Sequence, residues 1–100
     1  MTDAGVDAGL MEGGRPRLLP KARLRFDQVR GRHVLLLPER AVILSETAAE
    51  ILRLCDGGRT GAELVQTLER KYPGAELGGD VAEFLGEAVK KRWVEWVLPP

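Results

Sequence analysis

Two side chains in this sequence, those of His33 and Cys55, are of types that act as nucleophiles, general bases or ligands of soft metal ions. His33 opens an apolar run, and no serine or aspartate beside it suggests a catalytic triad. Cys55 falls on the apolar stripe of a predicted helix, where cysteine packs as a small hydrophobic residue unless a cation lowers its pKa. Because a soft-metal site needs several such ligands, we predict neither a metal site nor nucleophilic catalysis.

The paired glycines do not have the spacing of a phosphate-binding loop. The pairs Gly13-Gly14, Gly57-Gly58 and Gly78-Gly79 match neither GxGxxG nor GxxxxGK[ST], so we interpret them as turn residues. The glutamates fall mostly on the polar faces of predicted helices, where solvation explains them. We therefore expect a protein that is not an enzyme and that binds no cofactor.

Length and composition indicate one small globular domain. The chain has 100 residues, 44% of them hydrophobic and 30% charged. One cysteine cannot form an internal disulfide and no secretory signal pattern opens the sequence, so the cytoplasm is the expected location. The longest apolar runs, such as residues 34–38, are far shorter than the ~20 residues that cross a bilayer, so no membrane span is expected.

The formal net charge is zero, but the charges are unevenly distributed. Residues 21–40 hold six basic and two acidic residues, whereas residues 41–100 hold seven basic and ten acidic residues. A chain without net positive charge is a poor ligand for a phosphate polymer. Nucleic acid is therefore not an expected partner.

Glycines and prolines without periodicity predict a flexible N-terminal tail over residues 1–20 and a folded domain over residues 21–98. Alternating apolar residues predict strands near residues 22–27, 33–37 and 41–44. Gly31 permits a turn between the first two, and Pro38 interrupts the chain before the third. We expect a three-stranded antiparallel meander.

Three amphipathic helices are predicted after the meander. Ser45 is suited to cap the first helix, and Asp56-Gly57-Gly58 ends it. Thr60 with Glu63, and Asp80 with Glu83, have the capping-box spacing that opens the second and third helices. Residues 93–97 form either a fourth strand or the unwinding end of the helix, and Trp93 and Trp96 are expected against the meander.

The third strand offers a mechanism for binding. It is short and last in the meander, so one of its edges is open to an extended peptide that adds as a strand. The alternative left open is that this edge pairs with the C-terminal segment or with a second copy of the chain.

Several short segments, in this order and spacing, resemble the pyrroloquinoline quinone (PQQ) biosynthesis protein D (PqqD) family over about residues 22–97. They are Arg23-Leu24-Arg25-Phe26-Asp27, Leu36-Leu37-Pro38-Glu39, Leu44-Ser45-Glu46-Thr47-Ala48, Ile51-Leu52, Leu54-Cys55-Asp56-Gly57, Asp80-Val81 and Phe84-Leu85. Ser45 departs from the asparagine frequent in that family, and Arg40 from its common glycine.

This resemblance implies an α+β, winged helix-turn-helix-like fold in which a three-stranded antiparallel meander precedes three α-helices. It implies a peptide chaperone, or recognition element for ribosomally synthesised, modified peptides, that has no catalysis of its own. Such a protein is expected to bind the precursor peptide PqqA and to present it to the radical S-adenosylmethionine enzyme PqqE, which cross-links a glutamate to a tyrosine. The iron–sulfur clusters belong to that enzyme.

In the family's mode the peptide lies along the third strand and against the third helix. The expected peptide-binding residues are Arg40, Ala41, Val42, Ile43, Leu44, Val81, Phe84, Leu85, Ala88, Lys91 and Arg92. Whether Phe84 and Leu85 face the peptide or the core is left open. The basic residues are expected to steer an acidic peptide, and Val42→Pro is expected to abolish strand pairing while the helices stay folded.

Two rival functions remain, a winged-helix DNA-binding protein and a purely structural dimerisation module. A DNA-reading third helix would present Asp80, Glu83 and Glu87 to phosphates, which is the wrong sign of charge. The oligomeric state, including a homodimer, is not fixed by the sequence.

Overall fold

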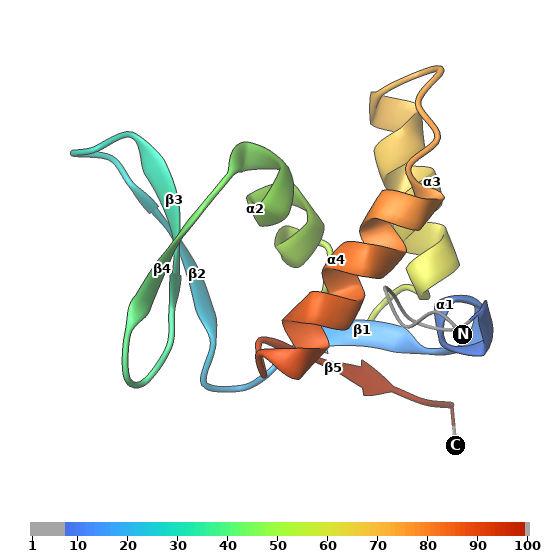
Figure 1. Cartoon of the computed structure of the whole chain (residues 1–100), viewed down its shortest axis with the longest axis horizontal. Helices are drawn as coiled ribbons and strands as arrows, with labels where there is room; N and C mark the ends of the chain where they lie inside the picture. The colour runs from blue at the N-terminus through green and yellow to red at the C-terminus, as the bar shows by residue number, and fades with distance from the viewer. Residues whose placement is uncertain (1–7, 100) are drawn as a thin grey trace.

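The computed structural model describes residues 8–99, which form two small antiparallel sheets and four helices (Figure 1). The first sheet has the strand order β2-β3-β4, from β2 (Arg23–Asp27), β3 (Arg32–Leu36) and β4 (Ala41–Leu44). The second sheet pairs β1 (Arg15–Leu18) with β5 (Val94–Val97). The helices are α1 (Ala8–Gly13), α2 (Glu46–Arg53), α3 (Gly61–Lys71) and α4 (Gly78–Lys90).

The predicted meander is confirmed. Leu24 lies opposite Leu35, and Leu35 lies opposite Val42, so these side chains share one face of the sheet. The helices lie on that side, with α2 next to the sheet and α4 crossing in front of α3 in the view of Figure 1. Fully buried leucines from four elements form the centre of the core: Leu35, Leu52, Leu64 and Leu85.

Two of the three predicted helix starts are confirmed. Ser45 Oγ accepts the Ala48 N–H at 3.1 Å. In the capping box of α3, Thr60 Oγ1 accepts the Glu63 N–H and Glu63 Oε1 accepts the Thr60 N–H. Each bond satisfies an amide that the first turn leaves without a helical partner.

The predicted capping box of Asp80 and Glu83 is wrong. Helix α4 begins at Gly78, so Leu77 occupies the cap position and no side chain caps the helix. The Leu77 N–H instead donates to Glu69 Oε2 at 2.8 Å, which ties the start of α4 to α3. Asp80 therefore lies inside the first turn, where its negative charge interacts favourably with the helix dipole.

The prediction of a flexible tail over residues 1–20 is wrong for residues 8–18, which form α1 and β1; residues 1–7 lie outside the described residues. The N–H of Gly61 donates to the Gly14 carbonyl, and the N–H of Leu18 donates to the Cys55 carbonyl. These bonds and the pairing with β5 join the N-terminal segment to the rest of the domain, so the folded unit begins before residue 21.

The C-terminal segment is a strand, and its partner is β1 rather than the meander. Trp96 lies opposite Pro16 and close to Gly14, so the expectation that it packs against the meander is wrong. Trp93, at the end of α4, is buried and lies near β4 as expected.

Candidate functional site

Strand β4 is the last strand of its sheet, and within residues 8–99 no strand pairs with its outer edge. The Leu37 N–H donates to the Arg40 carbonyl across the turn, so Leu37 and Arg40 form a hydrogen-bonded pair. Hydrogen-bonded and non-hydrogen-bonded pairs alternate along an antiparallel ladder from this point. From this register, Val42 and Leu44 direct their backbone groups toward β3. The N–H and C=O groups of Ala41 and Ile43 therefore face the open edge.

A groove of about 610 Å³ separates this edge from α4. Val42, Ile43 and Leu44 line it from the strand. Phe84 and Ala88 line it from the helix, and Trp93 closes it beyond the end of α4. Ile43 has 60% of its surface exposed and Phe84 is half-buried, so an apolar surface lies beside unpaired backbone groups.

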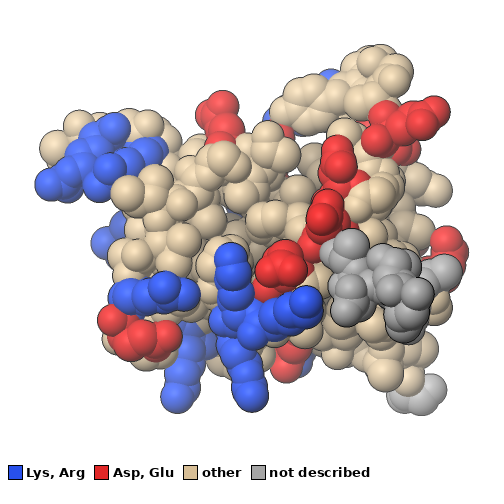
Figure 2. Space-filling view, in the orientation of Figure 1, with Lys and Arg blue, Asp and Glu red and all other residues tan. Residues whose placement is uncertain are grey.

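The rim of the groove carries charges of both signs along α4. Asp80, Glu83 and Glu87 lie on the rim, and Lys91 follows at the C-terminal end of the helix. Figure 2 shows acidic side chains along α4 and basic side chains gathered around its C-terminal end. The Lys91 ammonium lies 5.1 Å from the centroid of the Trp93 ring. The groove is therefore acidic at one end and basic at the other.

The structure brings most of the predicted site residues together. Six of them line the groove: Val42, Ile43, Leu44, Phe84, Ala88 and Lys91. Ala41 is exposed at the start of β4, with its backbone on the open edge.

Four predicted residues lie elsewhere. Val81 and Leu85 are core residues, with 2% and 0% of their surface exposed, and do not line the groove. Arg40 is exposed in the turn before β4. Arg92 lines a neighbouring cavity.

The sequence-based prediction missed six lining residues: Ser45, Ala48, Asp80, Glu83, Glu87 and Trp93. The spacing of Asp80, Phe84, Glu87 and Lys91 is that of a helical stripe adjacent to the core stripe of Val81, Leu85 and Ala88. That signal was present in the sequence, but the stripe is mostly charged and looks like an ordinary solvated face. Trp93 does not belong to this helical stripe, because the chain leaves the helix at Arg92, which has a φ of 65°.

His33 and Cys55, whose side chains could act in catalysis, both make contacts within the fold. The His33 ring lies 4.8 Å from the Phe26 ring, and its Nε2 lies 3.8 Å from Glu46 Oε2. Cys55 is buried and its Sγ donates to the Ile51 carbonyl at 3.3 Å. Burial, with a smaller effect from Asp56, raises the pKa of the Cys55 thiol to about 12. Such a thiol is not a nucleophile near neutral pH.

In the part of the chain that the structure describes, no group of three or more His, Cys, Asp or Glu side chains could hold a metal ion. No helix there is long and apolar enough to span a membrane.

The comparisons with known proteins point to one family. The family described as Coenzyme PQQ synthesis protein D (PqqD) matches residues 32–94. The PqqA binding protein of Rhodopseudomonas palustris (strain HaA2) is 45% identical over 82 residues, 80% of this chain and 80% of that protein. The PqqA binding protein of Methylococcus capsulatus (strain ATCC 33009 / NCIMB 11132 / Bath) is 38% identical over 81 residues, 81% of this chain and 87% of that protein.

A solved structure shares the fold. The solution NMR structure of the PqqD truncation of Methylobacterium extorquens PqqCD matches with a TM-score of 0.71 and 35% sequence identity, covering 94% of this chain and 99% of that chain. That protein is described as a functional, stand-alone recognition element for ribosomally synthesised and post-translationally modified peptides. The predicted α+β fold, with a three-stranded antiparallel sheet and helices, is confirmed.

Proposed function

Because this chain belongs to the coenzyme PQQ synthesis protein D family, we propose that it binds the precursor peptide PqqA and presents it to the radical S-adenosylmethionine enzyme PqqE. The names of its relatives support the peptide as ligand. The observation that carries the proposal is the open edge of β4 beside an apolar groove.

Binding proceeds by addition of the peptide as a fourth strand to the β2-β3-β4 sheet. The outward N–H and C=O groups of Ala41 and Ile43 bond to the peptide backbone, which gives affinity without dependence on sequence. Every second peptide side chain enters the groove and packs on Phe84 and Ala88. Selectivity for one peptide therefore comes from the groove, and affinity comes largely from the strand edge.

The role of this chain toward PqqE is to hold the peptide extended. An unbound peptide of this kind samples many conformations, and fixing its backbone on β4 removes much of the entropy cost before it reaches the enzyme. The cross-link between a glutamate and a tyrosine is then made by PqqE, which supplies the chemistry. The groove itself contributes strand pairing and apolar contacts.

The two rival functions are less well supported by the geometry. Asp80, Glu83 and Glu87 line the rim of α4, where a DNA-reading helix would need basic residues. A purely structural dimer, made by exchange of the N-terminal leader or of strands, would compete with the peptide if it paired two β4 edges, because both would use the same backbone groups.

An NMR titration tests the proposal. The ¹⁵N-labelled protein is titrated with synthetic PqqA, and amide shifts are expected at β4 and on the groove face of α4. Amides at the tip of the β2–β3 hairpin, such as Val29, serve as the internal control and should stay unchanged. Shifts confined to other surfaces, or no shifts with PqqE also present, would overturn the proposal.

A further inference from the structure

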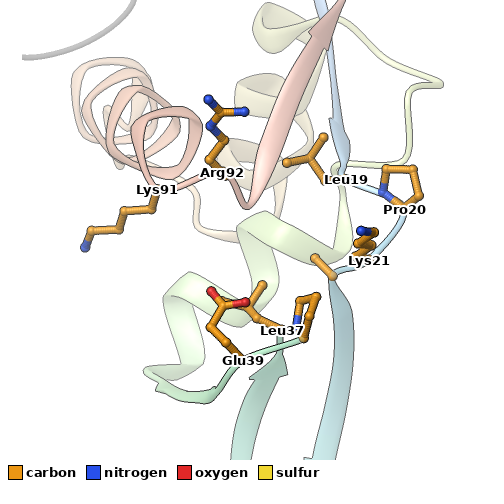
Figure 3. Close-up of a pocket in the computed structure, with 9 residues that line it drawn as sticks. Leu19, Pro20, Lys21, Leu37, Glu39, Lys91 and Arg92 are labelled. Carbon is orange, nitrogen blue, oxygen red and sulfur yellow. The ribbon is translucent and has the colours of Figure 1, made fainter.

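A second cavity lies at the Ala41 end of the groove. Its volume is about 500 Å³, and its lining comes from three places in the chain: residues 19–22, residues 37–39, and Lys91 with Arg92. Figure 3 shows Leu19, Pro20 and Lys21 on one side of it, Leu37 and Glu39 on another, and Arg92 on a third. Lys91 also lines the groove, so the two spaces adjoin at this residue.

The cavity has an apolar interior and a mostly basic rim. Leu19, Pro20, Ala22, Leu37 and Pro38 supply the apolar surface. Lys21, Lys91 and Arg92 contribute three positive charges, against the one negative charge of Glu39. Among the ion pairs formed within residues 8–99, none involves these four side chains.

The backbone conformation of Arg92 is unusual for an arginine. Arg92 has a φ of 65°, and within residues 8–99 it is the only non-glycine residue with a positive φ. The Trp93 N–H donates to the Ala88 carbonyl and the Arg92 N–H to the Val89 carbonyl, the pattern that ends many helices. Glycine is the usual residue at this position because a side chain is strained there.

An arginine at a position that favours glycine indicates a use for its side chain. Arg92 lines the cavity, and Figure 3 shows its guanidinium directed away from Leu37 and Glu39, on the outer side. A planar guanidinium is well suited to bind a carboxylate. The opposite end of the groove carries Asp80 and Glu83, which repel a carboxylate. The charge distribution therefore places acidic groups of a bound peptide at the Arg92 end.

We infer that this cavity extends the peptide groove and binds an apolar side chain together with a neighbouring carboxylate of the peptide, where the peptide strand leaves β4 beyond Ala41. Arg92, supported by Lys21 and Lys91, binds the carboxylate, and the apolar side chain fills the cavity. This inference rests on the proposed function, and it adds the class of peptide segment that the site recognises.

The test compares Arg92→Gly with a matched variant, Arg70→Gln, which removes one positive charge from the last turn of α3. Affinity for synthetic PqqA is measured by calorimetry at low and high salt, and amide shifts are followed by NMR. Arg92→Gly should bind about two- to fivefold more weakly at low salt, the range typical of one exposed charge contact. It should also melt at a higher temperature, because glycine relieves the strain at positive φ.

Arg92→Lys keeps the charge but not the planar guanidinium, so its affinity should lie between those of Arg92→Gly and the unsubstituted protein. Glu39→Gln should increase the affinity, because Glu39 is the one acidic side chain among the residues that line the cavity. Replacing the acidic residues of the peptide one at a time with their amides should reveal one position whose effect disappears in Arg92→Gly. Arg70→Gln should bind as the unsubstituted protein does.

The outcomes separate this inference from the proposed function. Unchanged affinity in Arg92→Gly, with peptide-induced shifts still present at β4 and α4, would overturn the inference and leave the proposed function intact. An equal loss in Arg70→Gln would also overturn it, because the effect would then come from net charge. Absence of any peptide binding by the unsubstituted protein would overturn both.

Discussion

Pro16 of β1 lies directly opposite Trp96 of β5, in a register that also places Arg17 opposite Glu95. The Arg17 guanidinium donates to Glu95 Oε2 through Nε at 3.0 Å and Nη2 at 2.6 Å. This pairing joins the C-terminal strand to the N-terminal segment. As a consequence β5 does not pair with β4, whose edge stays available to a ligand.

Gly14→Ala should destabilise the protein by about 1–3 kcal/mol, the usual cost of forcing a methyl group into a filled space. A Cβ at Gly14 would lie 2.8 Å from Trp96 Cε3 and 2.9 Å from the Leu10 carbonyl oxygen. The second contact is with backbone, so it cannot be relieved by a rotamer change. The free energy of unfolding, measured in urea, tests this.

Gly13→Ala is the matched control, because a Cβ at Gly13 has no neighbour within 4 Å. It should unfold at nearly the same urea concentration as the unsubstituted protein. Equal stability of the two variants would show that the β1–β5 sheet does not pack on Gly14 in solution as it does here.

The sequence predicted the meander and helices α2, α3 and α4 because their signals are local. Alternation marks the strands, and capping residues with apolar stripes mark the helices. The β1–β5 pairing has no local signal, since Arg17 and Glu95 are 78 residues apart. Strand β1 also contains Pro16 and two arginines, a composition that resembles a loop.

Ile43→Pro should weaken the binding of PqqA while the domain stays folded. The Ile43 N–H faces the open edge, so proline removes a donor that only an added strand would use. Affinity should fall at least tenfold, as expected for the loss of about 1.4 kcal/mol or more. Calorimetry measures the affinity, and the methyl NMR spectrum shows whether the fold is intact.

Two variants serve as controls for Ile43→Pro. Ile43→Ala keeps the N–H and should lose less affinity, since it removes only side-chain contact. Val42→Pro, which the sequence suggested as the test, is expected to disturb the sheet itself, because the Val42 N–H is directed toward β3. Retained affinity in a folded Ile43→Pro variant would contradict strand addition along β4.

The site could be predicted in outline but not residue by residue. Strand order indicated the free edge, and the resemblance indicated α4 as the opposite wall. The side of α4 that faces the groove depends on the helix rotation, which packing of Val81 and Leu85 in the core determines. A hydrophobic stripe alone does not distinguish residues at its margin, such as Phe84, from those at its centre.

Glu50 should make stability depend on pH through its contacts with α3. Its carboxylate accepts hydrogen bonds from the Lys71 ammonium and from the Tyr72 hydroxyl, and the first of these is the main cause that holds its pKa below the usual range. A carboxylate with a lowered pKa stabilises the fold above its unfolded-state value, about 4.3, and this contribution disappears as the pH falls through the lowered value.

Glu50→Gln should therefore be less stable than the unsubstituted protein at pH 7, and the difference should shrink below about pH 4. Urea unfolding at a series of pH values measures this. Glu76→Gln, at an exposed glutamate that forms none of the ion pairs seen within residues 8–99, is the control and should show no such difference. A difference for Glu50→Gln that stays constant down to pH 3 would contradict the ion pair as its source.

Cys55 should resist alkylation in the folded protein and react readily once the chain unfolds. Cys55 has 3% of its surface exposed, and burial raises the pKa of its thiol to about 12. At pH 8 the thiolate fraction is then lower than in an unfolded chain by about a thousandfold, given an ordinary pKa near 8.5. Iodoacetamide labelling followed by mass spectrometry should show a rate that rises with urea in step with global unfolding. A native-state rate close to that of free cysteine would mean that the end of α2 opens locally, and that Cys55 is not held in the core.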